Sequence, residues 1–237
     1  MSNDYFRFKQ FVIHQGNAAM KVGTDSVLLG AWTNIAGCKN ILDVGTGTGL
    51  IMLMLAQRSN ANILGIEIDN SAFLQAGENI SLTKWENRCK VVHISLQEFC
   101  KSSNYTFDLI VSNPPYFDNS LKSPSKERTL SRHTDSLSYD ELFESSAELL
   151  SELGKLSIIV PSNKLAELIK IAGLNTLYVS RITKVIPVTG KSHKRVLLEF
   201  CKTEMTPSET QIVIENGKRH NYTEDYKLLT KDFYLNF

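Results

Sequence analysis

Residues 41–49 read Ile-Leu-Asp-Val-Gly-Thr-Gly-Thr-Gly, and this stretch decides the fold. Its apolar beginning predicts a buried strand, and residues 50–56, Leu-Ile-Met-Leu-Met-Leu-Ala, predict a well-buried helix. Gly45, Gly47 and Gly49 stand between the two elements. Glycines remove side chains where the backbone turns sharply and let a ligand lie against the main chain, while the helix start offers unpaired amides. The stretch therefore predicts a ligand-binding loop between a strand and a helix.

Short β-rich runs alternate with helical stretches after residue 40. The predicted strands span residues 41–44, 63–68, 90–94, 107–112, 155–160, 177–182 and 195–200. The predicted helices span residues 50–56, 70–82, 139–150 and 163–172. This alternation predicts an α/β domain with a largely parallel sheet. The loop between the last two strands is too short for a crossover helix, so we expect those strands to pair antiparallel.

The composition indicates a soluble globular protein with one main domain. Of its 237 residues, 42% are hydrophobic and 22% are charged, and the net charge of +1 provides no global field for attracting nucleic acid. The four cysteines form no CxxC pair and no metal-ligand spacing, so neither a disulfide framework nor a metal site is expected. The sequence shows neither a signal peptide nor a membrane span, and we expect a cytoplasmic location.

The chain divides into three expected parts. Residues 40–202 form the core, residues 1–39 form an extension before it, and residues 203–237 form a polar tail. The tail ends in Asp-Phe-Tyr-Leu-Asn-Phe, whose aromatic residues indicate that it docks on the core. Residues 117–137 form a polar loop that is long for a compact fold.

An acidic residue ends the second predicted strand. Glu67 lies 22 positions beyond Gly45, where a carboxylate can accept both hydroxyl protons of a ribose. A solvated carboxylate at a strand end is the alternative interpretation. The glycine loop alone suits nicotinamide, flavin and S-adenosylmethionine binders, but its spacing departs from the dinucleotide pattern GxGxxG. That departure favours S-adenosylmethionine.

Residues 112–118, Ser-Asn-Pro-Pro-Tyr-Phe-Asp, follow the fourth predicted strand. The two prolines fix the backbone, so the Asn113 side chain and the Pro114 carbonyl offer acceptors in a fixed relation. A planar amino group needs two such acceptors, one for each hydrogen. Tyr116 adds an aromatic face on which a flat substrate can stack. The motif predicts a holder for a planar amine, although an isolated motif of this kind can also be a rigid turn.

The glycine loop, Glu67 and the Asn-Pro-Pro-Tyr motif all follow strands, and ligands of open α/β sheets bind at that edge. We expect a methyl donor there to face the amine. Methyl transfer from a sulfonium needs no nucleophilic side chain, so positioning and carbonyl dipoles supply the catalysis.

Together these residues resemble the class I, amino-directed S-adenosylmethionine methyltransferases, and more closely the bacterial tRNA (adenine-N6) methyltransferases that act beside the anticodon of a valine tRNA. The resemblance is carried by residues 6–32, 43–49, 67–69, 112–117, 131–142, 157–163 and 222–237. It implies a Rossmann-like fold with a mostly parallel seven-stranded sheet whose last strand is antiparallel.

The resemblance also implies the site residues and a tRNA partner. No membrane, metal or obligatory protein partner is expected. Asn113, Pro114 and Tyr116 would hold the target adenine. The cofactor would contact Lys21, Thr24, Asp25, Asp43, Gly45, Gly47, Gly49, Glu67, Ser95 and Asn113. Ser95 stands where the family usually has an aspartate, so its hydroxyl, Gln97 or backbone alone would meet the cofactor adenine.

Two clusters of basic residues are candidate RNA contacts, with ordinary solvated loops as the alternative. The first cluster lies in the long polar loop and contains Lys122, Lys126, Arg128, Arg132 and His133. The second lies before the last predicted strand and contains Lys191, His193, Lys194 and Arg195.

Other functions remain open at this stage. A glutamine side chain in a protein presents the same planar amine, but such enzymes resemble a larger architecture, and only 39 residues precede the first predicted strand here. DNA adenine methylation normally needs a separate recognition domain. A non-catalytic RNA-binding protein would not need an intact amine holder, and a nicotinamide oxidoreductase would leave the Asn-Pro-Pro-Tyr motif without a task.

Overall fold

A computed structural model describes residues 4–16, 20–115 and 137–237. The strands are β1 (Tyr5–Arg7), β2 (Val12–His14), β3 (Asn40–Val44), β4 (Asn62–Glu67), β5 (Cys89–His93), β6 (Phe107–Ser112), β7 (Leu150–Pro161), β8 (Tyr178–Val188), β9 (Arg195–Cys201) and β10 (Ser208–Glu215). The α-helices are α1 (Thr24–Trp32), α2 (Leu50–Arg58), α3 (Asn70–Ser81), α4 (Leu96–Ser102), α6 (Tyr139–Leu149), α7 (Leu165–Leu174) and α8 (Glu224–Thr230). A short 3-10 helix, Ser162–Lys164, precedes α7.

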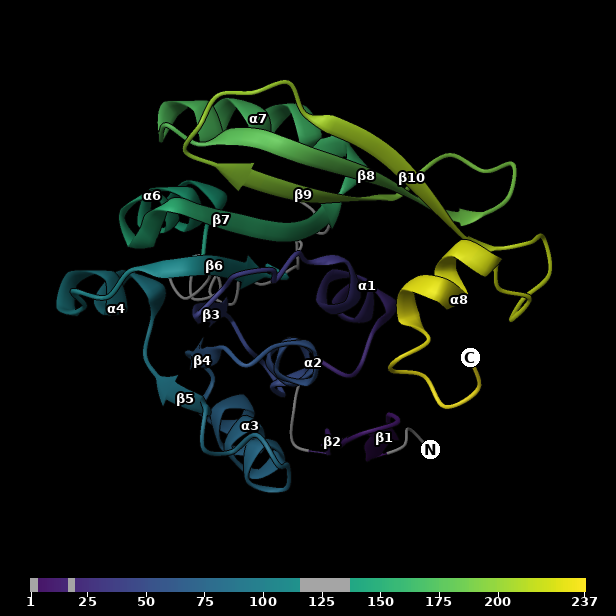
Figure 1. The fold of residues 1–237 in the computed structure, drawn as a ribbon, viewed down its shortest axis with the longest axis horizontal. Helices are drawn as coiled ribbons and strands as arrows, with labels where there is room; N and C mark the ends of the chain where they lie inside the picture. The colour runs from purple at the N-terminus through teal and green to yellow at the C-terminus, as the bar shows by residue number, and fades with distance from the viewer. Residues whose placement is uncertain (1–3, 17–19, 116–136) are drawn as a thin grey trace, which may run out of the picture.

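A twisted sheet of eight strands forms the centre of the molecule, in the order β10-β8-β9-β7-β6-β3-β4-β5 (Figure 1). Strand β9 pairs antiparallel with both β7 and β8, and the other pairs in this sheet are parallel. The predicted antiparallel pairing of the strands around residues 177–182 and 195–200 is therefore confirmed.

The predicted number of seven strands is wrong, because β10 adds an eighth beside β8. Its first four residues, Ser208–Gln211, are polar and exposed, and only Ile212 is buried. An edge strand buries little, so its sequence lacks the apolar run by which a central strand is recognised. The last strand in the chain thus lies parallel to its neighbour, and β9 is the reversed strand.

Helices cover both faces of the sheet and bury a separate core on each side. Helices α1 and α2 pack with Ile80 of α3 in one core, while α4, α6 and α7 pack in the other. In Figure 1 these two groups lie on opposite sides of the strands. Both faces of the central strands are therefore buried, which explains their nearly continuous apolar sequences.

The strand register fixes the edge at which the predicted motifs meet. Val44 at the end of β3 is paired with Ile66 of β4 on one side and Ser112 of β6 on the other. The loops that follow these three parallel strands consequently start at one level. Glu67 and Asn113 thus leave the sheet on either side of the glycine loop.

The beginning and the end of the described chain are connected by hydrogen bonds. The Lys9 amide donates to the Phe233 carbonyl at 2.8 Å, and its ammonium donates to main-chain oxygens of Lys231 and Phe237 at 2.6 and 2.7 Å. The Gln57 side chain of α2 donates to the Asp232 carbonyl at 2.8 Å. Helix α8 also contacts α1 (Figure 1). The division at residues 39 and 203 remains a prediction, but these contacts support docking of residues 203–237.

Among the described helices, none is both long enough and apolar enough to cross a membrane.

Replacing Phe233 by alanine tests this docking. Phe233 is 1% exposed in the core that α1 and α2 share, so Phe233→Ala is expected to lower the free energy of unfolding by about 3–5 kcal/mol. Leu228→Ala, at a side chain 65% exposed on α8, is the control and should change it by less than about 0.5 kcal/mol. Urea unfolding measures both, and equal effects of the two substitutions would contradict the docking.

Candidate active site

The glycine loop has the backbone conformation that its sequence predicts. Gly45, Gly47 and Gly49 have φ angles of +67°, +57° and +81°, a region that side chains disfavour. The Gly45 and Thr46 amides both donate to the Ile66 carbonyl, at 3.0 and 3.1 Å. The loop is thus fastened to the end of β4 while it turns from β3 into α2.

The three glycines differ in what surrounds them. A Cβ at Gly45 would meet no atom within 4 Å, and one at Gly47 would meet only the Gly45 carbonyl at 4.0 Å. A Cβ at Gly49, in contrast, would lie 3.7 Å from the Ala76 side chain of α3. Gly45 and Gly47 therefore border open space in which a ligand can lie against the main chain, whereas Gly49 lets α2 begin close to α3.

Asp43 supports the loop from inside the protein. Its side chain is 0% exposed, and its Oδ2 accepts from the Thr46 hydroxyl at 2.6 Å and the Met52 amide at 3.1 Å. Its Oδ1 is buried without a hydrogen-bond partner among the described residues. Burial raises the pKa of Asp43 to about 7, since desolvation outweighs the two hydrogen bonds, and the nearby Glu67 charge adds to the rise.

Glu67 connects the glycine loop to the loop after β4. Its Oε2 accepts from the Gly47 amide at 2.8 Å, and its Oε1 accepts from the amides of Ile68 and Asp69, both at 2.9 Å. A carboxylate has about four acceptor positions, so these three bonds leave one for a ligand hydroxyl. Ile68, 49% exposed next to Glu67, adds an apolar surface that the sequence interpretation did not include.

Ser95, the predicted contact for the cofactor adenine, is occupied in a helix cap. Its hydroxyl donates to Glu98 Oε2 at 2.7 Å and accepts from the Glu98 amide at 3.2 Å, which forms a capping box at the start of α4. The Gln97 side chain hydrogen-bonds to Glu141. Of the three predicted possibilities, the engaged side chains favour contact through the backbone.

Asn113 follows β6 and is oriented by the first turn of α1. Its Nδ2 donates to the Ser26 hydroxyl at 3.0 Å, so the amide oxygen is turned to the opposite side of the group. The preceding Ser112 hydroxyl donates to the Val44 carbonyl at 2.9 Å, which ties this corner to the start of the glycine loop. Pro114 is buried and Pro115 is exposed. Tyr116 lies outside the described residues.

The predicted cofactor-side segment leads into α1. Lys21 and Thr24 are exposed, and Thr24 is the first residue of α1. The Asp25 carboxylate accepts from Arg195 Nε at 2.8 Å and forms a salt bridge that is partly exposed on both sides. The structure thus pairs a predicted cofactor contact with a predicted RNA contact, across 170 positions of sequence.

The predicted RNA-contact clusters are only partly described. Lys122, Lys126, Arg128, Arg132 and His133 lie outside the described residues. Lys191 and Lys194 are exposed in the loop between β8 and β9, where the Lys194 amide donates to the Val185 carbonyl at 3.0 Å. This loop stands at the same end of the sheet as Asp25, to which Arg195 connects it.

Three residues that the sequence interpretation missed position the site. Ser26 orients Asn113, as described above. Asn79 of α3 is fully buried and donates to the carbonyls of Thr48 and His14, both at 2.9 Å. Gly65 of β4 leaves room for Met52 and Thr46, because a Cβ there would lie 2.6 Å from the Met52 methyl. Each acts through partners distant in sequence, so local patterns give no signal for them.

The arrangement can hold two ligands side by side. Exposed main chain at Gly45 and Gly47, with Glu67, suits a ribose-bearing ligand, and the Asn113 corner suits a planar amine. Within residues 4–16, 20–115 and 137–237, no group of three or more His, Cys, Asp or Glu side chains can hold a metal ion.

Comparison with known families gives one match that covers most of the chain. Residues 18–177 match the family described as Methyltransferase small domain. The matched part extends from the segment before α1 to the residue before β8, and therefore includes the glycine loop, Glu67 and Asn113.

Several curated proteins are similar over the whole chain. The proteins named tRNA1(Val) (adenine(37)-N6)-methyltransferase from Parabacteroides distasonis and Trichodesmium erythraeum are 47% and 43% identical to it. The first alignment covers 99% of both chains, and the second covers 100% of both. The protein of the same name from Haemophilus influenzae is 44% identical over 98% of this chain and 99% of its own.

Solved structures share the fold at low sequence identity. A predicted O-methyltransferase from Agrobacterium tumefaciens superposes with a TM-score of 0.69 at 18% identity, covering 88% of this chain and 96% of its own. A ribosomal protein L11 methylase from Lactobacillus delbrueckii has a TM-score of 0.58 at 17% identity and covers 81% and 84%. These likenesses establish a class I methyltransferase fold.

The raised pKa of Asp43 predicts a pH dependence of stability. Because the folded state holds this proton up to about pH 7 and the unfolded chain releases it near pH 4, the free energy of unfolding falls as pH rises through that window. The free energy of unfolding should be lower at pH 8 than at pH 5, and Asp43→Asn should reduce this difference by on the order of 2 kcal/mol. Urea unfolding of both proteins at the two pH values measures this, and parallel pH profiles would contradict the assignment.

Proposed function

Since the chain belongs to the methyltransferase small domain family and, within it, to the tRNA1(Val) (adenine(37)-N6)-methyltransferases, we propose that it methylates the exocyclic N6 amine of an adenine in tRNA. The chain is an enzyme of the class I methyltransferase fold that uses S-adenosylmethionine as methyl donor. The proposed target is the anticodon-loop adenine that the relatives' names specify, in a valine tRNA.

The observation that carries the proposal is the position of Asn113 and Glu67 on either side of the glycine loop. Strand β4 ends in Glu67 and β6 ends one residue before Asn113; both strands pair with β3, and the glycine loop follows β3 directly. A cofactor lying on Gly45 and Gly47 would therefore be flanked by a ribose-binding carboxylate and an amine-holding amide. This is the arrangement that direct transfer from cofactor to amine requires.

The cofactor residues fit S-adenosylmethionine. Glu67 accepts a ribose hydroxyl at its remaining acceptor position, and Gly45 and Gly47 provide a surface without side chains. Asp43 keeps that surface in shape through Thr46 and Met52. Backbone groups after β5 and the apolar side chain of Ile68 would contact the adenine ring, since the Ser95 hydroxyl is engaged in the cap of α4.

Asn113 and the Pro114 carbonyl hold the amine of the substrate. With its Nδ2 on Ser26, the Asn113 amide presents its oxygen as an acceptor for one N6 hydrogen, and the Pro114 carbonyl accepts the other. These dipoles stabilise the positive charge that develops on nitrogen. A bound cofactor would supply an electrophilic methyl group on a sulfonium. As the N6 lone pair forms the new nitrogen–carbon bond, the sulfur–carbon bond would break and leave a neutral thioether, and the nitrogen would then release a proton to solvent. Tyr116 would stack against the base.

The competing functions have less support. The relatives named after tRNA adenine align along the whole chain, which gives no preference to a protein glutamine substrate. A tRNA substrate is found in the cytoplasm, and we propose that location for the enzyme. No obligatory protein partner is proposed.

A labelling experiment tests the function. Purified protein is incubated with methyl-labelled S-adenosylmethionine and total tRNA from a bacterium that lacks the corresponding methyltransferase, and the modified nucleoside is identified by mass spectrometry. We expect N6-methyladenosine in the anticodon loop of a valine tRNA. Label in protein alone, or in another nucleoside, would overturn the proposal.

Replacing Asn113 tests its role in holding the amine. Asn113→Ala is expected to reduce kcat by about 100- to 1000-fold, because one preorganised acceptor is lost, while the dissociation constant for S-adenosylmethionine changes little. Asn60→Ala, at an exposed asparagine between α2 and β4, is the control and should retain full activity. Single-turnover kinetics and equilibrium dialysis measure the two quantities. Undiminished turnover of the Asn113 variant would refute this role.

A further inference from the structure

A groove of about 900 Å³ lies between the N-terminal hairpin and the C-terminal part of the chain. It is bordered by β1, by the beginning of α1, by the ends of β8 and β10, and by α8 with the residues that follow it. Its volume falls within the range of sites that take small molecules or single side groups of larger ones. None of the proposed methyl-transfer steps uses the side chains of its C-terminal wall.

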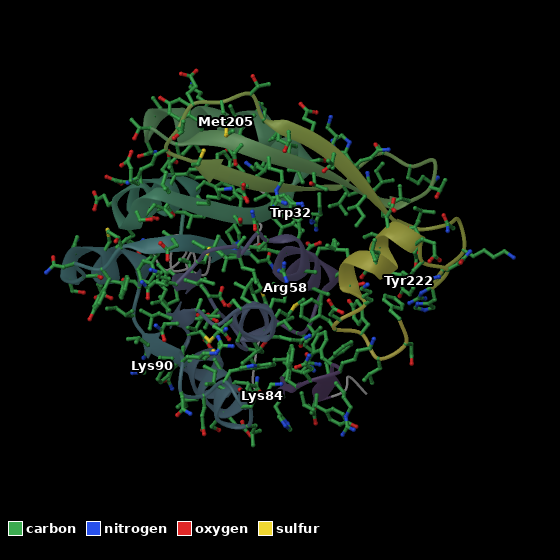
Figure 2. The ribbon with its side chains drawn as sticks, in the orientation of Figure 1. Trp32, Arg58, Lys84, Lys90, Met205 and Tyr222 are labelled. Carbon is green, nitrogen blue, oxygen red and sulfur yellow. The ribbon has the colours of Figure 1, made fainter. Side chains whose placement is uncertain are left out.

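Five aromatic rings contribute to the lining, with Phe6 on one wall and Tyr222, Tyr226, Tyr234 and Phe237 on the other. The Tyr222 and Tyr226 rings are stacked, with centroids 5.3 Å apart, and Phe237 meets Tyr222 edge-on at 5.0 Å. Tyr226 is buried, whereas Tyr222 is only partly covered. Figure 2 shows Tyr222 beside α8. The cluster thus holds a partly exposed ring in a fixed position.

Basic side chains lie around these rings. Arg7 lines the groove, and exposed Lys218 and Arg219 lie in the turn after β10. In the described part of the chain, neither Arg7, Lys218 nor Arg219 forms a salt bridge. Lys227 also lines the groove, but it is paired with Glu224 at 2.8 Å. The groove therefore combines aromatic faces with basic side chains that form no salt bridge in the described part of the chain, while Glu215 adds one carboxylate to its lining.

The turn that carries Lys218 and Arg219 is held in shape by several hydrogen bonds. The Asn216 amide donates to the Asn221 carbonyl at 2.7 Å, and the His220 amide donates to the Glu215 carboxylate at 2.8 Å. His220 has a φ angle of +65°, a strained conformation for this residue that the surrounding bonds maintain. The two cations are thus presented from a defined turn.

The first turn of α1 lies between the groove and the proposed methyl-transfer site. Thr24 lines the groove, Asp25 pairs with Arg195, and Ser26 contacts the Asn113 amide. Thr24 and Ser26 are about 3 Å apart along the helix axis but about 200° apart around it, so their side chains point to opposite sides of the turn. The groove therefore lies near Asn113, and a strand whose base is held there would pass around this turn of α1 to enter the groove.

We propose that this groove binds the RNA strand next to the target adenine, with one unpaired base stacked on the Tyr222 face and phosphates contacting Lys218, Arg219 and Arg7. Aromatic platforms beside cations are the usual means of binding single-stranded nucleic acid. This inference rests on the proposed function and extends it, since it assigns RNA binding to the C-terminal part of the chain.

Equilibrium binding tests the groove with the full-length protein. The probe is a fluorescent RNA hairpin whose loop contains the adenine that the wild-type enzyme methylates. Tyr222→Leu, which keeps apolar volume but removes the aromatic face, should weaken binding by about tenfold, whereas Tyr222→Phe should bind like wild type. The double substitution Lys218→Ala with Arg219→Ala should weaken binding by about tenfold and make it less salt-dependent.

Matched substitutions far from the groove are the controls. Tyr105, 76% exposed before β6, is replaced by leucine, and Lys90 of β5 with Lys170 of α7 are replaced by alanine. Figure 2 shows Lys90 on the side of the molecule away from Tyr222. These variants should bind the hairpin like wild type. Melting temperature and affinity for S-adenosylmethionine verify folding, and the exposed Lys218–Arg219 pair tests the proposal even if Tyr222→Leu fails to fold.

The possible results separate the inference from the proposed function. If the wild type methylates the hairpin and both groove variants bind it normally, the groove assignment is wrong and the function stands. If the wild type neither binds nor methylates RNA, both fall. If the groove variants lose methylation of a protein and not of RNA, the groove binds a protein segment and the inference is overturned.

Discussion

The shared register of β6, β3 and β4 is the constraint on which the proposed site depends. Val44 is paired with both Ser112 and Ile66, so the glycine loop, the Asn113 corner and Glu67 start from one level of the sheet. A slip of one residue would turn the side chains of a strand to the opposite face. Because both faces of these strands are buried in separate hydrophobic cores, such a slip is strongly disfavoured. Packing far from the ligands thus fixes the distance between the two proposed binding groups.

The glycine loop is maintained at a cost in stability. Asp43 is fully buried with one oxygen unpaired among the described residues, and its pKa is raised to about 7 by burial. Its other oxygen joins Thr46 to Met52, and Glu67 joins Gly47 to the loop after β4. Two carboxylates therefore hold opposite sides of the loop, one from the interior and one from the ligand side. Buried ionisable groups with a strongly shifted pKa are typical of functional sites.

Much of the core could be predicted because its signals are local. The glycine loop, the strand ends at Glu67 and Asn113, and the family resemblance follow from contiguous residues, and the resemblance is confirmed by relatives that cover the whole chain. Strand β10 was missed because half of it is polar and exposed at the sheet edge. The contacts of Ser26 with Asn113 and of Asp25 with Arg195 join residues far apart in sequence, which only the fold brings together. Sequence patterns alone do not show which residues at such separations come into contact.

The Asp25–Arg195 pair joins two residues that the sequence predicts to contact different ligands. Asp25 is predicted to contact the cofactor and Arg195 the RNA; the structure pairs their charges, and both ligand contacts remain predictions. The pair connects α1 to the beginning of β9, on the helix whose first turn also contacts Asn113 and lines the groove. Three consecutive residues, Thr24, Asp25 and Ser26, thus face the groove, the basic loop and the amine holder. The first turn of α1 thus connects the groove, the basic loop and the amine holder through adjacent residues.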